Sequence, residues 1–215
     1  MRVLAAVVLL GAGSLLSAQD RWEMSVVAGG SLYGNVEAAR SSPSAAAKAG
    51  FFKGGAAGAV VSQTGRQRWG GEFRYLFQSN NMRLRAASGA SGSADFSGQS
   101  HSFHYDVLLY ATPRAAAVRP FLAAGVGLKL YQADGQERAF QPLNNLVIFT
   151  RENDLKFLGS LGGGVKFPVH KHALVRLDFR DYITGIPKGF TGAPGARLAG
   201  QFHNLLVTGG IGIVF

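Results

Sequence analysis

Apolar and polar residues alternate along most of the chain with a period of two, as in a β-strand with one apolar and one polar face. The alternation is sharpest where three apolar residues are interleaved with three charged ones: Val175, Leu177 and Phe179 with Arg176, Asp178 and Arg180. A helix would turn Asp178 away from the two arginines, whereas a strand places all three charges on one face. This segment is therefore predicted to be a strand.

The same period recurs elsewhere and predicts eight strands of about 10–14 residues, longer than the ~5–6 residues usual in globular sheets. A tilted strand needs ~9–11 residues to cross the hydrocarbon of a membrane. The alternating segments lie within residues 22–33, 52–62, 68–77, 102–109, 122–130, 156–167, 175–180 and 205–215.

The connections between these strands alternate in length. Three are short, at residues 63–67, 112–119 and 168–171. Four are long and rich in Ser, Gly, Ala, Asn and Pro, which predicts loops: residues 34–50, 78–99, 132–154 and 184–200. Short turns at one end and long loops at the other are typical of an all-β, eight-stranded, antiparallel up-and-down transmembrane barrel, with the turns in the periplasm and the loops outside.

A soluble exported barrel with an apolar cavity, as in lipocalins, would show the same alternation. The two alternatives place Phe73, Leu177 and Ile211 on opposite faces, toward lipid or toward a cavity. Two features favour the membrane barrel. The polar face is rich in glycine, as a narrow lumen requires, and the aromatic residues of the apolar face gather in two belts near the strand ends. The expected girdle is Trp22, Trp69, Tyr75, Phe77, Phe103, Tyr105, Phe157 and Phe167, with Tyr105 toward the long-loop end.

Residues 1–18 have the layout of a secretory signal peptide: Arg2, an apolar stretch, small residues and Ala18 before the expected cleavage. The domain organisation is then a signal peptide at 1–18 and one barrel domain at 19–215. The chain has no Cys, which excludes disulfides and thiolate chemistry. Its net charge of +10 comes from scattered Lys and Arg, which argues against nucleic acid as a partner.

At its C-terminus the chain reads LVTGGIGIVF, in which Ile211, Ile213 and Phe215 share the apolar face. This ending resembles the C-terminal signal of bacterial outer-membrane proteins. The segments SFHYDVLLY, RPFLAAGVGLKLY and LVRLDFRDYITGIPK resemble strands of the outer membrane protein beta-barrel domain family, the OmpA/OmpX-type small barrels. The resemblance implies residence in the outer membrane, contact with its lipid, recognition by the barrel-insertion machinery and a monomeric state.

Charged residues on the polar face would share the lumen of a closed barrel, where each must be paired or cost several kcal/mol of desolvation. They are Glu72, Arg74, Asp106, Lys129, Arg176, Asp178 and Arg180. We expect them to form an ion-pair plug, so that the barrel has a structural role. A narrow, porin-like pore favouring anions is the alternative.

Catalytic and metal sites find little support in the sequence. His101, Ser102 and His104 lie close together, but Ser102 and His104 are expected to face inward and His101 outward. His170 and His172 flank a predicted turn without a third ligand. We therefore expect no enzyme activity, no cofactor and no metal. The long loops could bind a surface partner, which the sequence leaves undetermined.

Overall fold

The computed structural model describes residues 21–41, 44–65, 68–88, 91–135 and 142–215. The expected signal peptide at residues 1–18 lies outside them. Among the described residues, no helix is long and apolar enough to cross a membrane.

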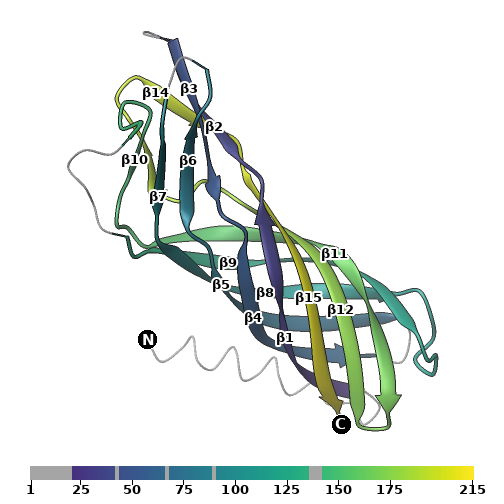
Figure 1. Ribbon diagram of the computed structural model, residues 1–215. Coiled ribbons are helices and arrows are strands. Elements are labelled where there is room, and N and C mark those ends of the chain that lie inside the picture. Colours follow the sequence, from purple (N-terminus) through teal and green to yellow (C-terminus); the bar gives the residue numbers. More distant parts are fainter. Residues whose placement is uncertain (1–20, 42–43, 66–67, 89–90, 136–141) are drawn as a thin grey trace, which may run out of the picture.

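Eight antiparallel strands close into a barrel in the order β1-β15-β12-β11-β9-β8-β5-β4, which confirms the predicted fold class (Figure 1). Each strand pairs with the next barrel strand along the chain, and β1 pairs with β15 to close the barrel. The barrel strands are β1 (Arg21–Tyr33), β4 (Gly54–Thr64), β5 (Trp69–Ser79), β8 (Gly98–Tyr110), β9 (Arg119–Ala133), β11 (Asp154–His170), β12 (Ala173–Thr184) and β15 (Phe202–Val214).

The barrel wall is apolar on its outside and polar on its inside. Phe73, Leu177 and Ile211 are 49%, 54% and 65% exposed on the outer surface. Charged side chains such as Glu72 and Arg176 are fully buried in the lumen. A soluble barrel with an apolar cavity requires the reverse arrangement, so that alternative is wrong for this chain.

Glycines on the inner face let neighbouring strands and lumen side chains approach closely. A Cβ atom at Gly127 would lie 2.1 Å from the carbonyl oxygen of Phe103 and 2.4 Å from Cβ of His104. Any side chain at this position would therefore collide with the adjacent strand and with the residues that fill the lumen.

The four long connections, which the sequence analysis predicted as loops, contain seven further strands within the described residues. Five form a second sheet in the order β14-β2-β3-β6-β7, which rises beyond the barrel at the end opposite the C-terminus (Figure 1). The prediction of irregular loops is wrong for these segments. The strands are β2 (Val36–Ser41), β3 (Ser44–Phe51), β6 (Met82–Ala86), β7 (Ser93–Phe96), β14 (Ala196–Ala199) and the separate pair β10 (Val147–Phe149) and β13 (Phe190–Gly192).

This second sheet is called here the extracellular sheet, after the side of the membrane on which the long connections are expected, and it packs on a hydrophobic core. Val36, Ala38, Leu84 and Phe149 are all at most 3% exposed within it. The core continues down to Tyr131 and Phe202 at the mouth of the barrel. Because these apolar side chains are removed from water, the segments are ordered rather than irregular.

Candidate functional site

Six of the seven predicted lumen charges meet in the middle of the barrel, where each is at most 3% exposed. β5 contributes Glu72 and Arg74, and β8 contributes Asp106. β12 contributes Arg176, Asp178 and Arg180 at alternate positions, because every second side chain of a strand points to the same face. These six residues are called here the central cluster.

Short ion pairs connect the central cluster. Arg74 Nη2 lies 2.8 Å from Glu72 Oε1 and 2.9 Å from Asp178 Oδ1. Arg176 Nη2 lies 2.8 Å from Glu72 Oε2, and its Nε lies 2.8 Å from Asp178 Oδ2. Arg180 Nη1 donates to Asp106 Oδ2 at 2.8 Å. Three arginines and three carboxylates thus balance one another, which offsets the cost of removing their charges from water.

The contact between Arg176 and Glu72 spans the lumen. Its two strands, β12 and β5, are four places apart in the closed ring of eight and so form opposite walls. At this level, side chains from opposite walls are therefore in direct contact, 2.8 Å apart. The arrangement fits a plugged lumen.

Lys129, the seventh predicted member, lies outside the central cluster. Its Nζ donates to Tyr33 Oη at 2.7 Å and to Gln78 Oε1, on the side of the extracellular sheet. In the described part of the chain it forms no ion pair, and the rings of Tyr33 and Tyr131 lie 5.0 and 5.1 Å from its ammonium. Hydroxyl, amide and ring contacts therefore take the place of the expected carboxylate.

Aromatic residues cover Lys129 at the mouth of the barrel. Phe51 stacks on Tyr131 with ring centroids 5.6 Å apart, and it also meets Phe190 at 5.3 Å and Phe202 at 5.1 Å. Phe190 and Phe51 come from segments that were expected to be loops or their margins. This aromatic cap is a consequence of the extracellular sheet that the sequence analysis missed.

A third buried charge group, which was not predicted from the sequence, lies toward the short turns. Lys166 Nζ donates to Glu23 and to Tyr110 Oη, the latter at 3.0 Å. Arg119 Nη1 lies 4.0 Å from Glu23 Oε1, and its guanidinium lies 4.0 Å from the ring of Tyr110. The period-two pattern already placed Glu23 and Lys166 on the polar face, which was the available signal, whereas Arg119 was assigned to a turn.

The histidines that the sequence singled out lie in two separate places, the pair His101 and His104 on β8 and the pair His170 and His172 at the turn after β11. His101 faces outward and shares a 2.9 Å hydrogen bond with Tyr75 Oη, while Ser102 Oγ donates to the carbonyl of Leu76. His104 is buried between Asp106 and Tyr182 at 3.2 and 2.6 Å. His170 and His172 flank a tight turn, as expected. Within the described ranges, no three His, Cys, Asp or Glu side chains are grouped to hold a metal ion.

The predicted girdle residues lie on the outer wall. Trp22, Trp69, Phe103, Tyr105 and Phe157 are exposed there, and Tyr75, Phe77 and Phe167 are partly exposed. Tyr105 differs from expectation: its hydroxyl lies over Gly71, near the short-turn end of β5, rather than toward the long connections.

The residues of the expected insertion signal are also on the outer wall. Ile211, Ile213 and Phe215 are 65%, 52% and 65% exposed. The backbone N–H of Phe215 donates to the carbonyl of Trp22 at 2.9 Å, so the last residue lies beside the start of β1.

Several solved structures align with most of this chain. OprG, an outer membrane protein from Pseudomonas aeruginosa, aligns over 92% of this chain and 97% of its own, with a TM-score of 0.52 and 13% identity. Neisserial surface protein A aligns over 90% and 96%, with a TM-score of 0.48 and 12% identity. The outer membrane protease OmpT from Escherichia coli aligns over 91% and 97%, with a TM-score of 0.49 and 11% identity.

No protein-family model and no curated protein matches the chain. At 13% identity the similarity to OprG shows a shared fold alone. It agrees with the closed ring of eight strands and with the apolar outer wall. This chain therefore has the fold of the small eight-stranded outer-membrane barrels of the OmpA/OmpX type.

Proposed function

We propose that the protein is a non-conducting outer-membrane barrel with a structural role: it anchors the extracellular sheet and holds it above the membrane surface. The observation that carries this proposal is the contact between opposite walls of the barrel at three levels of the lumen. A porin-like role, the alternative from the sequence, requires a continuous aqueous path through those same levels.

The three levels lie in series along the barrel axis. Toward the extracellular sheet, Lys129 of β9 reaches Tyr33 of β1. In the centre, Arg176 reaches Glu72, and toward the short turns Arg119 of β9 approaches Glu23 of β1. Since β9 and β1 are also opposite walls, an ion would have to displace buried, hydrogen-bonded side chains three times.

The extracellular sheet is the part of the protein that the barrel would hold outside the membrane. It is tied to the barrel by a shared apolar core, so it cannot swing freely as an irregular loop would. Its outward face carries exposed polar and charged residues, including Glu37, Lys48 and Arg85. Such a surface suits contact with molecules outside the cell.

The rest of the proposal follows from this location. We place the protein in the outer membrane as a monomer, exported by residues 1–18 and inserted after recognition of Ile211, Ile213 and Phe215. We assign it no catalytic residue, because His104 and Ser102 are buried in the wall and filled lumen, out of reach of a substrate.

Conductance measurements in planar bilayers test the proposal. Folding is checked first, by comparing unboiled and boiled samples on an SDS gel, where a closed barrel migrates faster unboiled. The folded protein is then added to a bilayer in which a general porin gives current steps as the positive control. We expect no current steps from the wild type, and regular steps from the heat-modifiable protein would overturn the plugged lumen.

A further inference from the structure

We propose that the outer wall of the barrel binds one anionic membrane lipid, with an acyl chain lying along β1 and β15 and the headgroup phosphate on Lys53. The proposal rests on the membrane location proposed above. It concerns the lipid-facing wall and is independent of whether the lumen conducts.

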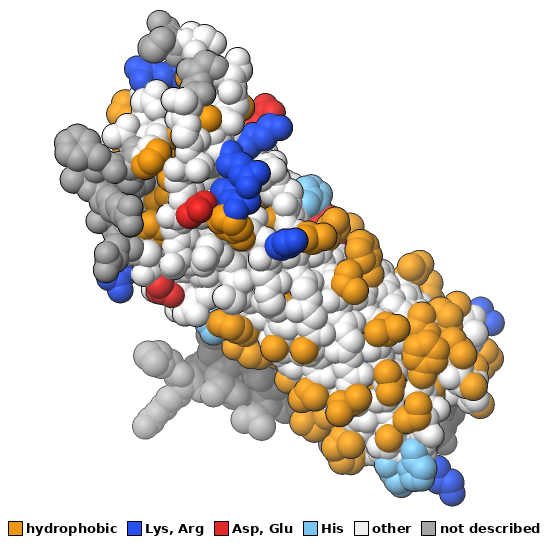
Figure 2. Space-filling model, in the orientation of Figure 1, with side chains coloured by type: hydrophobic (Ala, Val, Ile, Leu, Met, Phe, Trp, Pro, Cys, Tyr) orange, Lys and Arg blue, Asp and Glu red, His pale blue; other side chains and the backbone are white. Residues whose placement is uncertain are grey.

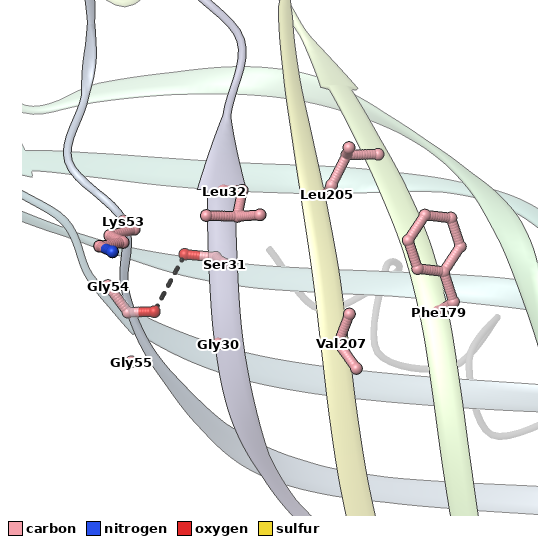
Figure 3. A pocket seen from close by; sticks show the side chains of 9 residues that line it. All are labelled: Gly30, Ser31, Leu32, Lys53, Gly54, Gly55, Phe179, Leu205 and Val207. Carbon is pink, nitrogen blue, oxygen red and sulfur yellow. Dashed lines mark hydrogen bonds between the residues drawn. The ribbon is translucent and has the colours of Figure 1, made fainter.

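A hollow of about 520 Å³ lies on this wall near the extracellular sheet (Figure 3). Its floor is formed by Gly30 of β1 and Gly55 of β4, which are directly paired across the two strands. Leu32, Leu205, Val207 and Phe179 line the side toward β15 and β12. Two facing glycines thus remove side chains at the point where the neighbouring strands carry large ones.

A second hollow of about 440 Å³ continues along the same strands toward the short turns. Its floor holds another pair of small residues, Ala28 and Gly209, and Val26, Leu177 and Ile211 surround it. From Leu32 to Val26 the two hollows extend ~20 Å at ~3.3 Å per residue. That length exceeds the ~15 Å of hydrocarbon in one leaflet, so an extended acyl chain fits it.

An apolar groove alone would bind the acyl chain of any lipid. Positive charge at the extracellular end of the groove would select lipids with an anionic headgroup. Lys53 lines the hollow at its extracellular end and, among the described residues, forms no ion pair. The outward face of the adjoining sheet adds Lys48, Arg83 and Arg85 against two carboxylates, Glu37 and Asp95, which leaves a positive excess. Arg83 Nε lies 3.6 Å from Asp95 Oδ1, and its guanidinium stacks 3.0 Å over the ring of Phe52. Figure 2 shows Lys and Arg side chains gathered on this sheet, with acidic side chains beside them, above the hydrophobic barrel wall. A phosphate at the membrane interface would meet this positive field.

A lipid suits the groove better than a second copy of the chain does. In a bilayer there is no hydrophobic gain from pressing two apolar walls together, because lipid tails are equally apolar. A symmetric dimer across this groove would also bring the two Lys53 ammonium groups together, a repulsion that an anionic headgroup avoids.

The test is native mass spectrometry of the detergent-folded protein with equal amounts of phosphatidylglycerol and phosphatidylcholine that carry the same acyl chains. We expect one phosphatidylglycerol to be retained by the wild type in preference to phosphatidylcholine. Lys53→Gln should lower that preference about fivefold, the effect of one interfacial charge. Lys171→Gln, in the turn between β11 and β12, is the matched control and should leave it unchanged.

A second pair of variants tests the groove itself. Gly55→Leu should abolish retention of either lipid, because a side chain there fills the hollow, and no atom lies within 4 Å of its Cβ to disturb the fold. Gly159→Leu is the control: it lies on the outer wall of β11, away from the groove, with its nearest Cβ contact at 3.9 Å.

Each contrary outcome has its own meaning. Equal retention of both lipids with no effect of Lys53→Gln would overturn the headgroup assignment, and unchanged retention in Gly55→Leu would overturn the groove. A wild-type dimer that Gly55→Leu dissociates would make a second copy the occupant. A wild-type protein that shows no heat-modifiability would instead overturn the membrane barrel itself. Failure of the lipid proposal can therefore be told apart from failure of the proposed function.

Discussion

At the scale of single residues, the central cluster shows how charges are accommodated inside a narrow barrel. Asp106 has two partners: Arg180 at 2.8 Å and His104 at 3.2 Å. Arg180 also reaches Glu72 at 3.2 Å, so it links two carboxylates from different strands. Removing an arginine of this kind leaves a buried carboxylate without its partner. The free-energy cost of that unpaired charge exceeds the net stabilisation that the ion pair provides.

Arg180→Ala should therefore lower the free energy of unfolding by about 3–5 kcal/mol. Urea titration of the folded fraction in detergent, followed by the gel shift between folded and unfolded bands, measures the change. Arg197→Ala, an exposed arginine on β14, should stay within about 0.5 kcal/mol of the wild type. Unchanged stability of Arg180→Ala would contradict the plug.

Lys129 should respond in the opposite way, because its ammonium has no carboxylate to leave behind in the described part of the chain. Lys129→Met keeps the length of the side chain and removes a buried charge. Gln78 Oε1 still accepts from Asn204 Nδ2 at 3.1 Å. We expect an unfolding free energy within about 1 kcal/mol of the wild type, or higher.

The comparison with Arg180→Met, measured under the same conditions, separates the two cations. That variant should lose about 3–5 kcal/mol, because it leaves Asp106 buried and under-compensated. A similar large loss in Lys129→Met would show that Lys129 contributes to the ion-pair network after all.

At the scale of elements, the extracellular sheet is the main departure from expectation. Its strands are short and rich in Ala, Ser and Gly, a composition that favours loops. The period of two was nevertheless present in β6, where Met82 and Leu84 point into the core and Arg83 and Arg85 point outward. The loop-like composition of these segments outweighed the period of two in the prediction. The strands are stable only when they pair with their neighbours in the sheet.

Leu84→Asp tests whether this sheet has a core of its own. Leu84 is fully buried, and the lost packing alone is worth about 2–5 kcal/mol. We expect trypsin to cleave the folded variant near Lys48, Arg83 or Arg85, which the paired strands protect in the wild type. Mass spectrometry of the fragments identifies the cleavage sites.

Two controls complete this experiment. Ser93→Asp, on the exposed face of the neighbouring β7, should remain resistant to trypsin. The barrel of Leu84→Asp should remain heat-modifiable, because its strands pair without β6. Loss of the barrel together with the sheet would mean that the two form one cooperative unit.

At the scale of the whole molecule, the outer wall should contact lipid while the extracellular sheet contacts water (Figure 2). Because the chain has no cysteine, single-cysteine variants allow clean spin labelling. A nitroxide on Leu177→Cys should be relaxed by oxygen, which concentrates in lipid. A nitroxide on Lys48→Cys should be relaxed by a water-soluble nickel chelate instead. Reversed accessibilities would place the barrel outside the bilayer.

The sequence by itself determined the barrel: the strands, their parity and the placing of Glu72, Asp106 and Arg176 on the inner face. It could do so because a period of two is a local property, readable from neighbouring residues along one strand. The lumen charges of Glu23 and Lys166 were within reach of the same argument.

Only the tertiary structure decided which charges meet. Arg176 and Glu72 lie 104 positions apart and come together because barrel closure places β12 opposite β5. The same closure leaves Lys129 among tyrosines, makes strands of the long connections and sets Gly30 beside Gly55 on the outer wall. These features depend on register and on packing between distant segments, so that even the period of two in β6 becomes a stable strand only beside its partners.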